Sequence, residues 1–173
     1  MITYNDKVDI NTNSNLPDEN KVTASDMNQI KKNINDLYTK SKISLYKSQS
    51  QSFTTNSSKL IFDIVEENQN FTYENGIITV NKNMNALISF SVEFMYSSNK
   101  PYKLIKVIVA RNNQEKVILS AIQKSDWDTV NNSKIVALQE DDEIRIEIEV
   151  ENDISLNVRQ GSNFLQIYEV KDE

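Results

Sequence analysis

Residues Lys59–Phe94 read KLIFDIVEENQNFTYENGIITVNKNMNALISFSVEF, and the end of this stretch alternates strictly between apolar and polar side chains. The apolar set is Ile88, Phe90, Val92 and Phe94, and the polar set is Ser89, Ser91 and Glu93. Successive side chains of a strand point to opposite faces. The spacing therefore predicts a half-buried β-strand, with one face in a core and the other in water.

Short apolar segments continue in both directions from this strand and are separated by polar clusters. We expect strands at Ile43–Lys47, Leu60–Val65, Phe71–Tyr73, Ile77–Val80, Ala86–Tyr96, Tyr102–Arg111, Lys116–Gln123, Ser133–Leu138, Glu143–Val150, Ser155–Arg159 and Phe164–Val170. Many strands at this spacing with no helix between them predict a β-sandwich or barrel. Ser48–Ser58 is low in complexity and is expected to be a surface loop, and Asn131-Asn132 is expected to be a turn.

Two further patterns concern strand edges and turns. In EIRIEIEV, residues 143–150, the isoleucines point inward and the charged residues point outward. We interpret that charged face as solvated and as a guard against edge-to-edge aggregation. The chain has only two Gly and two Pro, so its turns must rely on Asn and Asp, which tolerate the left-handed conformation.

Composition excludes several classes of function. The 173 residues carry a formal charge of −6, which argues against binding a nucleic-acid backbone. The sequence has no Cys and no His, so disulfides, thiolate sites and the usual general base and metal ligand are missing. The N-terminus has no apolar secretory core, and no apolar run reaches membrane-spanning length. We expect a protein kept in a cytoplasm, or one that leaves by a route such as cell lysis.

Residues 1–20 are mostly polar, with a few spaced apolar side chains: Ile2, Tyr4, Val8, Ile10 and Leu16. Such a segment buries too little surface to fold alone. It is either a disordered tail or an extended docking peptide that becomes ordered on a partner. The spaced apolar residues are the candidates for that docking contact.

Residues 21–41 are expected to contain a short helix. Thr23, Ser25 and Asp26 suit its N-cap and first turn. Its apolar stripe follows at 3-4-3 spacing and comprises Met27, Ile30, Ile34 and Leu37. A helix this short is marginal alone in water, so the stripe needs a second surface. That surface is either symmetry copies of the same helix, forming a trimeric neck, or the host domain or a partner protein.

The order of motifs in residues 42–173 resembles the complement (C-one-q) and tumour-necrosis-factor-like jelly roll. The matching residues are Ile61-Phe62-Asp63, Asn70, Tyr73, Gly76–Val80, Leu87–Val92, Leu138–Ile144 and Gly161–Tyr168. The resemblance implies an all-β, antiparallel jelly-roll sandwich of about ten strands that forms a trimeric binding head. The chain departs from the family at Met84-Asn85-Ala86, where Pro-Gly-x-Tyr is usual, and at the acidic turn, where Asp141 or its neighbour replaces a Gly.

A second resemblance lies in Asn20–Lys31, NKVTASDMNQIK. It is similar to a segment near the start of many tailed-phage appendage proteins. That resemblance implies a virion protein, made in the bacterial cytoplasm, whose N-terminus binds capsid or tail proteins. A compact head fibre, a receptor-binding tail or baseplate appendage, and a bacterial surface or spore-coat binding module all stay open as hypotheses, in that order of preference.

Candidate chemistry is sparse, and we expect no cofactor, no metal and no enzymatic activity. Glu140–Glu143 lacks the spacing of a calcium loop and is expected to be a solvated turn. A carbohydrate-active enzyme is disfavoured because no carboxylate pair stands out. Trp127 between Asp126 and Asp128 is the best candidate for stacking on a host-surface glycan, unless it caps the sandwich or an interface. Tyr96 and Tyr102 are further ligand-binding candidates.

Overall fold

A computed structural model gives the fold and describes residues 24–38, 40–53, 58–94, 102–123, 129–151, 154–155 and 162–170. The chain divides into two units, Met1–Lys40 and Ser41–Glu173. In the first, α1 (Ala24–Tyr38) is the expected short helix. Its stripe residues Met27 and Ile30 are 38% and 48% exposed.

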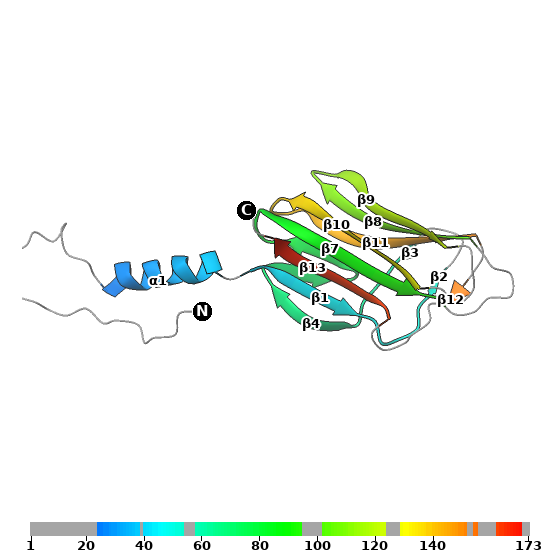
Figure 1. The fold of residues 1–173 in the computed structure, drawn as a ribbon, viewed down its shortest axis with the longest axis horizontal. Helices are drawn as coiled ribbons and strands as arrows, with labels where there is room; N and C mark the ends of the chain where they lie inside the picture. Colours follow the sequence, from blue (N-terminus) through cyan, green and yellow to red (C-terminus); the bar gives the residue numbers. More distant parts are fainter. Residues whose placement is uncertain are drawn as a thin grey trace, which may run out of the picture. The chain divides into compact units, whose positions relative to one another are not determined.

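The second unit is built from two main antiparallel sheets (Figure 1). The first sheet has the order β10 (Thr129–Leu138), β7 (Met84–Glu93), β13 (Phe164–Val170), β1 (Lys42–Tyr46), β4 (Ile64–Gln69). The second sheet has the order β5 (Phe71–Glu74), β6 (Ile77–Val80), β11 (Glu143–Val150), β8 (Lys103–Arg111), β9 (Gln114–Gln123), with β3 (Ser58–Lys59) beside β11. A small pair joins β2 (Ser52–Phe53) to β12 (Ile154–Ser155). The predicted all-β jelly-roll sandwich is confirmed.

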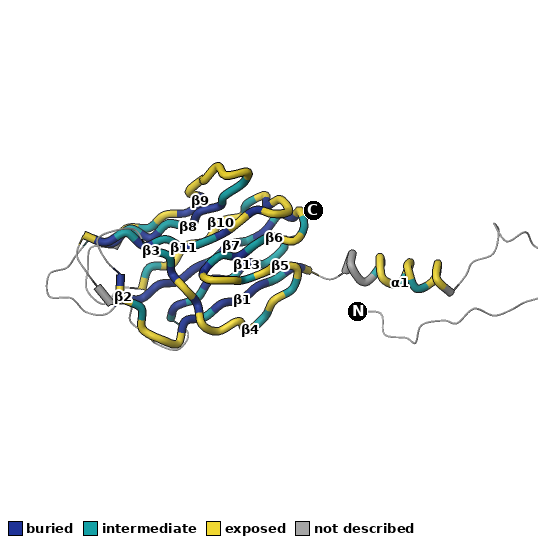
Figure 2. Tube along the Cα trace, turned by 180° about the vertical axis from the view of Figure 1, so that it is seen from behind, coloured by how far each residue is buried: buried dark blue, intermediate teal, exposed yellow. Residues whose placement is uncertain are grey.

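The core lies between the two sheets, as strand periodicity predicts. Ile88, Phe90 and Val92 of β7 are at most 1% exposed, and so are Ile144 and Ile146 of β11. Buried positions alternate with less buried ones along the strands of both sheets (Figure 2). The inward faces of β7 and β11 thus meet as two walls of one apolar core.

Four sequence-based expectations about this unit are wrong. Ser48–Ser58 is not wholly a surface loop, because Phe53 is 0% exposed and its ring packs edge-on against Phe94, 6.5 Å between centroids. Asn131-Asn132 is not a turn but lies within β10. Ser91 and Glu93 are 4% and 5% exposed rather than in water.

The fourth correction concerns the charged face of residues 143–150. β11 is not an edge strand, because it pairs with β8 on one side and with β6 and β3 on the other. Its outward Arg145 forms ion pairs with Glu147 and with Glu115 of β9, each 2.7 Å from nitrogen to oxygen. These charges therefore lie on the outside of a central strand, where Arg145 pairs with Glu147 of the same strand and with Glu115 of β9.

Turns use Asn and Asp in the left-handed region, as the scarcity of Gly predicts. Positive φ angles occur at Asn70, Asn75, Asn112, Asn113 and Asp141. The acidic turn places Asp141 in the left-handed region at φ 67°, so a residue other than glycine adopts this conformation.

A buried carboxylate holds that acidic turn. Asp142 is 0% exposed and accepts hydrogen bonds from Arg111 Nε (2.7 Å), Arg111 Nη2 (2.6 Å) and the backbone N–H of Gln139 (2.8 Å). Glu140–Glu143 is therefore not a wholly solvated turn. Burial alone raises the pKa of Asp142, but the hydrogen bonds from Arg111 and Gln139 outweigh burial and hold that pKa below its usual value.

A second carboxylate, that of Glu169, fixes the start of the first strand. The Glu169 carboxylate accepts a hydrogen bond from the backbone N–H of Ser41 at 2.7 Å and lies 2.9 Å from the Lys82 ammonium. Burial opposes ionisation of Glu169, yet the bonds from Ser41 and Lys82 leave its pKa lowered. The chain thus enters the sandwich at an anchored point.

These lowered pKa values predict acid sensitivity. A carboxylate whose folded pKa lies below its unfolded pKa stabilises the fold above the unfolded value, about 4, and loses that contribution as pH falls further. We expect the free energy of unfolding to be nearly constant from about pH 5 to 8, since no His titrates there, and to fall below about pH 4. Urea unfolding at several pH values measures this. Asp142→Asn should be less stable at pH 7 and show a shallower acid slope; an unchanged slope would contradict the assignment.

Candidate functional site

The outer face of the first sheet carries a group of partly exposed apolar and aromatic side chains that the register places together. Residues opposite one another in a sheet point to the same face. Because Ile43, Leu165 and Ile88 point into the core, their sequence neighbours point outward. The outward side chains on four neighbouring strands are Tyr46 of β1, Phe164 and Tyr168 of β13, Leu87 of β7 and Ile135 of β10.

Hydrogen bonds fix the aromatic rings of this face. Gln166 Nε2 donates to Tyr46 Oη at 2.8 Å, and the hydroxyls of Ser44 and Tyr168 lie 3.1 Å apart. The Tyr46 and Phe164 rings have centroids 6.3 Å apart. Burial, together with the Glu66 carboxylate, raises the pKa of Tyr46 and keeps its hydroxyl neutral. The polar atoms are thus paired within the face, which leaves the rings to contact another surface.

Exposed apolar side chains also follow the neighbouring strand edges. Val117 and Ile122 of β9 are 48% and 58% exposed, and Ile135 of β10 is 60% exposed. β9 and β10 are edge strands of their sheets. A half-apolar face beside an apolar edge has the chemistry of a protein–protein contact.

The strand ends define two ends of the sandwich. We call the end at Ser41 the proximal end, and Met84 and its pairing partner Leu138 lie there as well. The distal end is defined by strand ends that the register brings together: Thr129 lies opposite Glu93, and Lys103 lies opposite Gln123 and Val150. The strands that flank the predicted ligand-binding residues therefore end together.

Buried polar groups form the base of the distal end. Asn163 is 0% exposed; its Oδ1 accepts a hydrogen bond from the backbone N–H of Glu93 at 2.7 Å, and its carbonyl accepts one from Lys47 N–H at 3.1 Å. Lys103 is 1% exposed, with its ammonium 5.5 Å from the centroid of the Phe94 ring. This paired polar layer rigidifies the strand ends.

Many of the predicted site residues lie outside the described residues. These are Ile2, Tyr4, Val8, Ile10, Leu16, Tyr96, Asp126, Trp127, Asp128 and the side chain of Leu37. Tyr102 is described: it is partly exposed before β8, and its carbonyl accepts a hydrogen bond from Glu151 N–H at 3.1 Å. Met27, Ile30 and Ile34 lie on α1 as expected.

Sequence reasoning missed Tyr46, Leu87, Phe164 and Tyr168. The available signal was Phe164–Tyr168, FLQIY, where bulky side chains occupy both faces of one strand. Such a pattern is typical of a strand that is covered on both sides.

Among the residues that the structure describes, no group of three or more acidic side chains is arranged to hold a metal ion. Among the same residues, no helix has the length and apolar character needed to cross a bilayer.

Comparisons with known proteins identify the fold. No protein-family model and no curated protein matches the sequence. The structure is similar to that of murine APRIL at pH 8.5, with a TM-score of 0.63 and 13% identity over 76% of this chain and all of that one. It is also similar to Eiger TNF from S. frugiperda, with a TM-score of 0.63 and 10% identity over 78% of this chain and 94% of that one. The chain therefore has a TNF-like jelly-roll fold, and the tumour-necrosis-factor side of the predicted resemblance is confirmed at the level of fold.

Proposed function

We propose that this chain is a structural, non-enzymatic protein of a bacteriophage virion: a trimeric head fibre anchored by its N-terminus. Three copies associate through the outer face of the first sheet, residues 1–20 bind a capsid protein, and the distal end binds a host-surface ligand, a glycan in the first instance. The observation that carries the proposal is the uncovered apolar face around Leu87 and Tyr168.

The apolar surfaces meet the requirement of a three-fold ring. In a closed ring each copy presents one patch to its neighbour and receives a different one. The outer face of the first sheet supplies one patch, and Val117 and Ile122 at the β9 edge supply the other. Burying both patches removes apolar area from water in every copy, worth roughly 25 cal/mol per Å².

The two ends of the sandwich support separate roles in anchoring and in ligand binding. The chain enters at Ser41, on the proximal end, so the segment that precedes the sandwich leaves from that end. The strands that flank Tyr96 and Trp127 end at the other end. Anchoring at one end and binding at the other lets several weak sites act together, because linked sites gain avidity without a tight single contact.

Deleting residues 1–20 tests the virion assignment. We expect the shortened chain to remain trimeric, because the outer face is untouched, and to be lost from purified particles. The measurement is incorporation of tagged full-length and shortened chains into phage particles, compared by immunoblot, with sedimentation of each free protein as the control. Equal incorporation of both chains would contradict N-terminal docking.

The remaining candidates differ in where the protein is found. A receptor-binding tail or baseplate appendage keeps the fold, the trimer and the anchor, and labelled electron micrographs separate it from a capsid fibre. A bacterial surface or spore-coat module would label cells or spores that carry no phage. Release of sugar from host envelope material would revive the glycoside-hydrolase alternative.

A further inference from the structure

A groove of about 590 Å³ opens where the two sheets diverge, between the β8–β9 hairpin and β10. Its apolar wall includes Val109, Ile118 and Val136, contributed by three strands. Its polar rim comes from the hairpin and includes Arg111 and Lys116. An apolar wall with a few convergent polar groups, at this volume, is typical of a small-molecule site.

Arg111 is held in place by a buried carboxylate and by a carbonyl of the groove lining. Its Nε and Nη2 atoms donate to the fully buried Asp142, and Nη2 also donates weakly to the Ala137 carbonyl, at 3.3 Å. The guanidinium is therefore oriented before any ligand arrives, which lowers the entropy cost of binding. Its side chain remains 39% exposed, and these three hydrogen bonds do not use Nη1.

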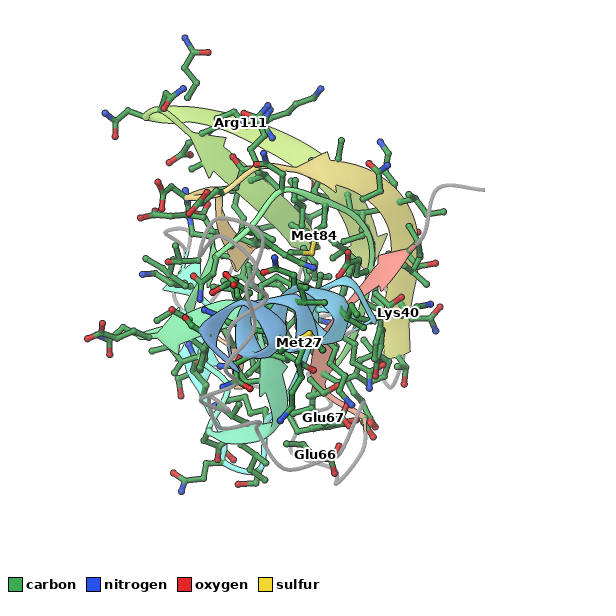
Figure 3. All side chains as sticks on the ribbon, turned by 90° about the vertical axis from the view of Figure 1, so that its left-hand side faces the viewer. Met27, Lys40, Glu66, Glu67, Met84 and Arg111 are labelled. Atoms are coloured by element: carbon green, nitrogen blue, oxygen red, sulfur yellow. The ribbon has the colours of Figure 1, made fainter. Side chains whose placement is uncertain are left out.

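Most charges around the groove are paired. The Arg111 guanidinium lies 2.6 Å from the buried Asp142 carboxylate, and Glu115 lies 2.7 Å from the Arg145 guanidinium. Lys116 adds an exposed positive charge to the rim. The acids Glu66 and Glu67 lie on the opposite side of the sandwich from Arg111 (Figure 3). The groove thus offers an anion one exposed cation beside an oriented guanidinium.

From this arrangement we infer that the groove binds a carboxylate carried on a body of about one sugar ring, such as the acidic residue of a glycan. The carboxylate accepts hydrogen bonds from Nη1 of Arg111 and from the ammonium of Lys116, since bonds between charged donors and acceptors are stronger than neutral ones. The ring lies against Val109, Ile118 and Val136, while the amides of Asn112 and Gln114 reach its hydroxyls. This site lies away from the distal end.

Saturation-transfer NMR on the full-length protein tests the assignment with four probes: N-acetylneuraminate, glucuronate, glucose and hexanoate. We expect millimolar binding of at least one sugar acid, and binding of glucose at least about fivefold weaker. Lys116→Gln should weaken sugar-acid binding about five- to tenfold, and Lys116→Glu should abolish it. Arg111 is left intact because its loss would leave the buried Asp142 carboxylate without its guanidinium partner.

Lys106→Gln is the matched control. It makes the same charge change on the outer face of β8, where Lys106 pairs with Glu149, and should leave binding unchanged. Equal binding of glucose and the sugar acids, a response to hexanoate alone, or no response to either sugar acid at about 50 mM would overturn the assignment. Light scattering on each variant shows whether the trimer is retained, so failure here is distinguishable from failure of the proposed assembly.

Discussion

Replacing Leu87 with lysine is expected to convert the trimer into monomers. Leu87 points outward from the middle of the first sheet, with Ile135 on one side and Tyr168 on the other. The substitution would bury an unpaired ammonium at each interface, which costs on the order of 3 kcal/mol or more. Association should weaken by at least about 100-fold per interface. Light scattering after size-exclusion chromatography at about 10 μM measures the change, a concentration at which intact interfaces hold.

Ile77→Lys is the matched control for this experiment. Ile77 is likewise a partly exposed aliphatic residue on the outside of a sheet; it lies on β6 opposite Glu74, and β11 and β8 separate it from β9. A lysine there gains an acidic cross-strand partner and stays in water. We expect Ile77→Lys to remain trimeric. Dissociation by Ile77→Lys, with Leu87→Lys unaffected, would place the interface at β6 of the second sheet.

Replacing Phe53 with alanine is expected to destabilise the fold by about 3–5 kcal/mol, the usual cost of removing a fully buried phenylalanine. The side chain is 0% exposed, and its ring meets Phe94 edge-on. Urea denaturation at one fixed protein concentration measures the loss, because the stability of an oligomer depends on concentration. Phe53→Leu, which keeps most of the apolar volume, should cost only about 1 kcal/mol. Near-identical unfolding curves for Phe53→Ala and the parent chain would restore the surface-loop prediction for Ser48–Ser58.

Hydrophobic periodicity predicted the strand boundaries correctly where one face of a strand is buried and β-branched residues dominate that face. Ile77–Val80, Glu143–Val150 and Phe164–Val170 begin and end at their predicted residues. Alternation says which residues share a face but not what covers the other face. For that reason the outward side of β7 was assigned to water, although Glu93 is buried and Leu87 lies in the candidate interface.

Long-range contacts explain the remaining misses. Phe53 sits in a two-residue strand within a polar segment, and its burial depends on Phe94, far along the chain. Asn131-Asn132 looks like a turn locally, yet its pairing with β7 supplies the ladder that holds it in β10. Asp142 is one of four consecutive acids, and its burial depends on hydrogen bonds from Arg111, on another strand, and from the N–H of Gln139. Tertiary partners of this kind override local propensity.

Native mass spectrometry of the full-length protein at micromolar concentration is the most direct test of the central claim, that this jelly roll works as a three-copy assembly. The single chain has a mass of 19.9 kDa. The account predicts one dominant species at three times that mass, shifted to the single-chain mass by Leu87→Lys but not by Ile77→Lys. A dominant 19.9 kDa species in the parent protein would contradict it.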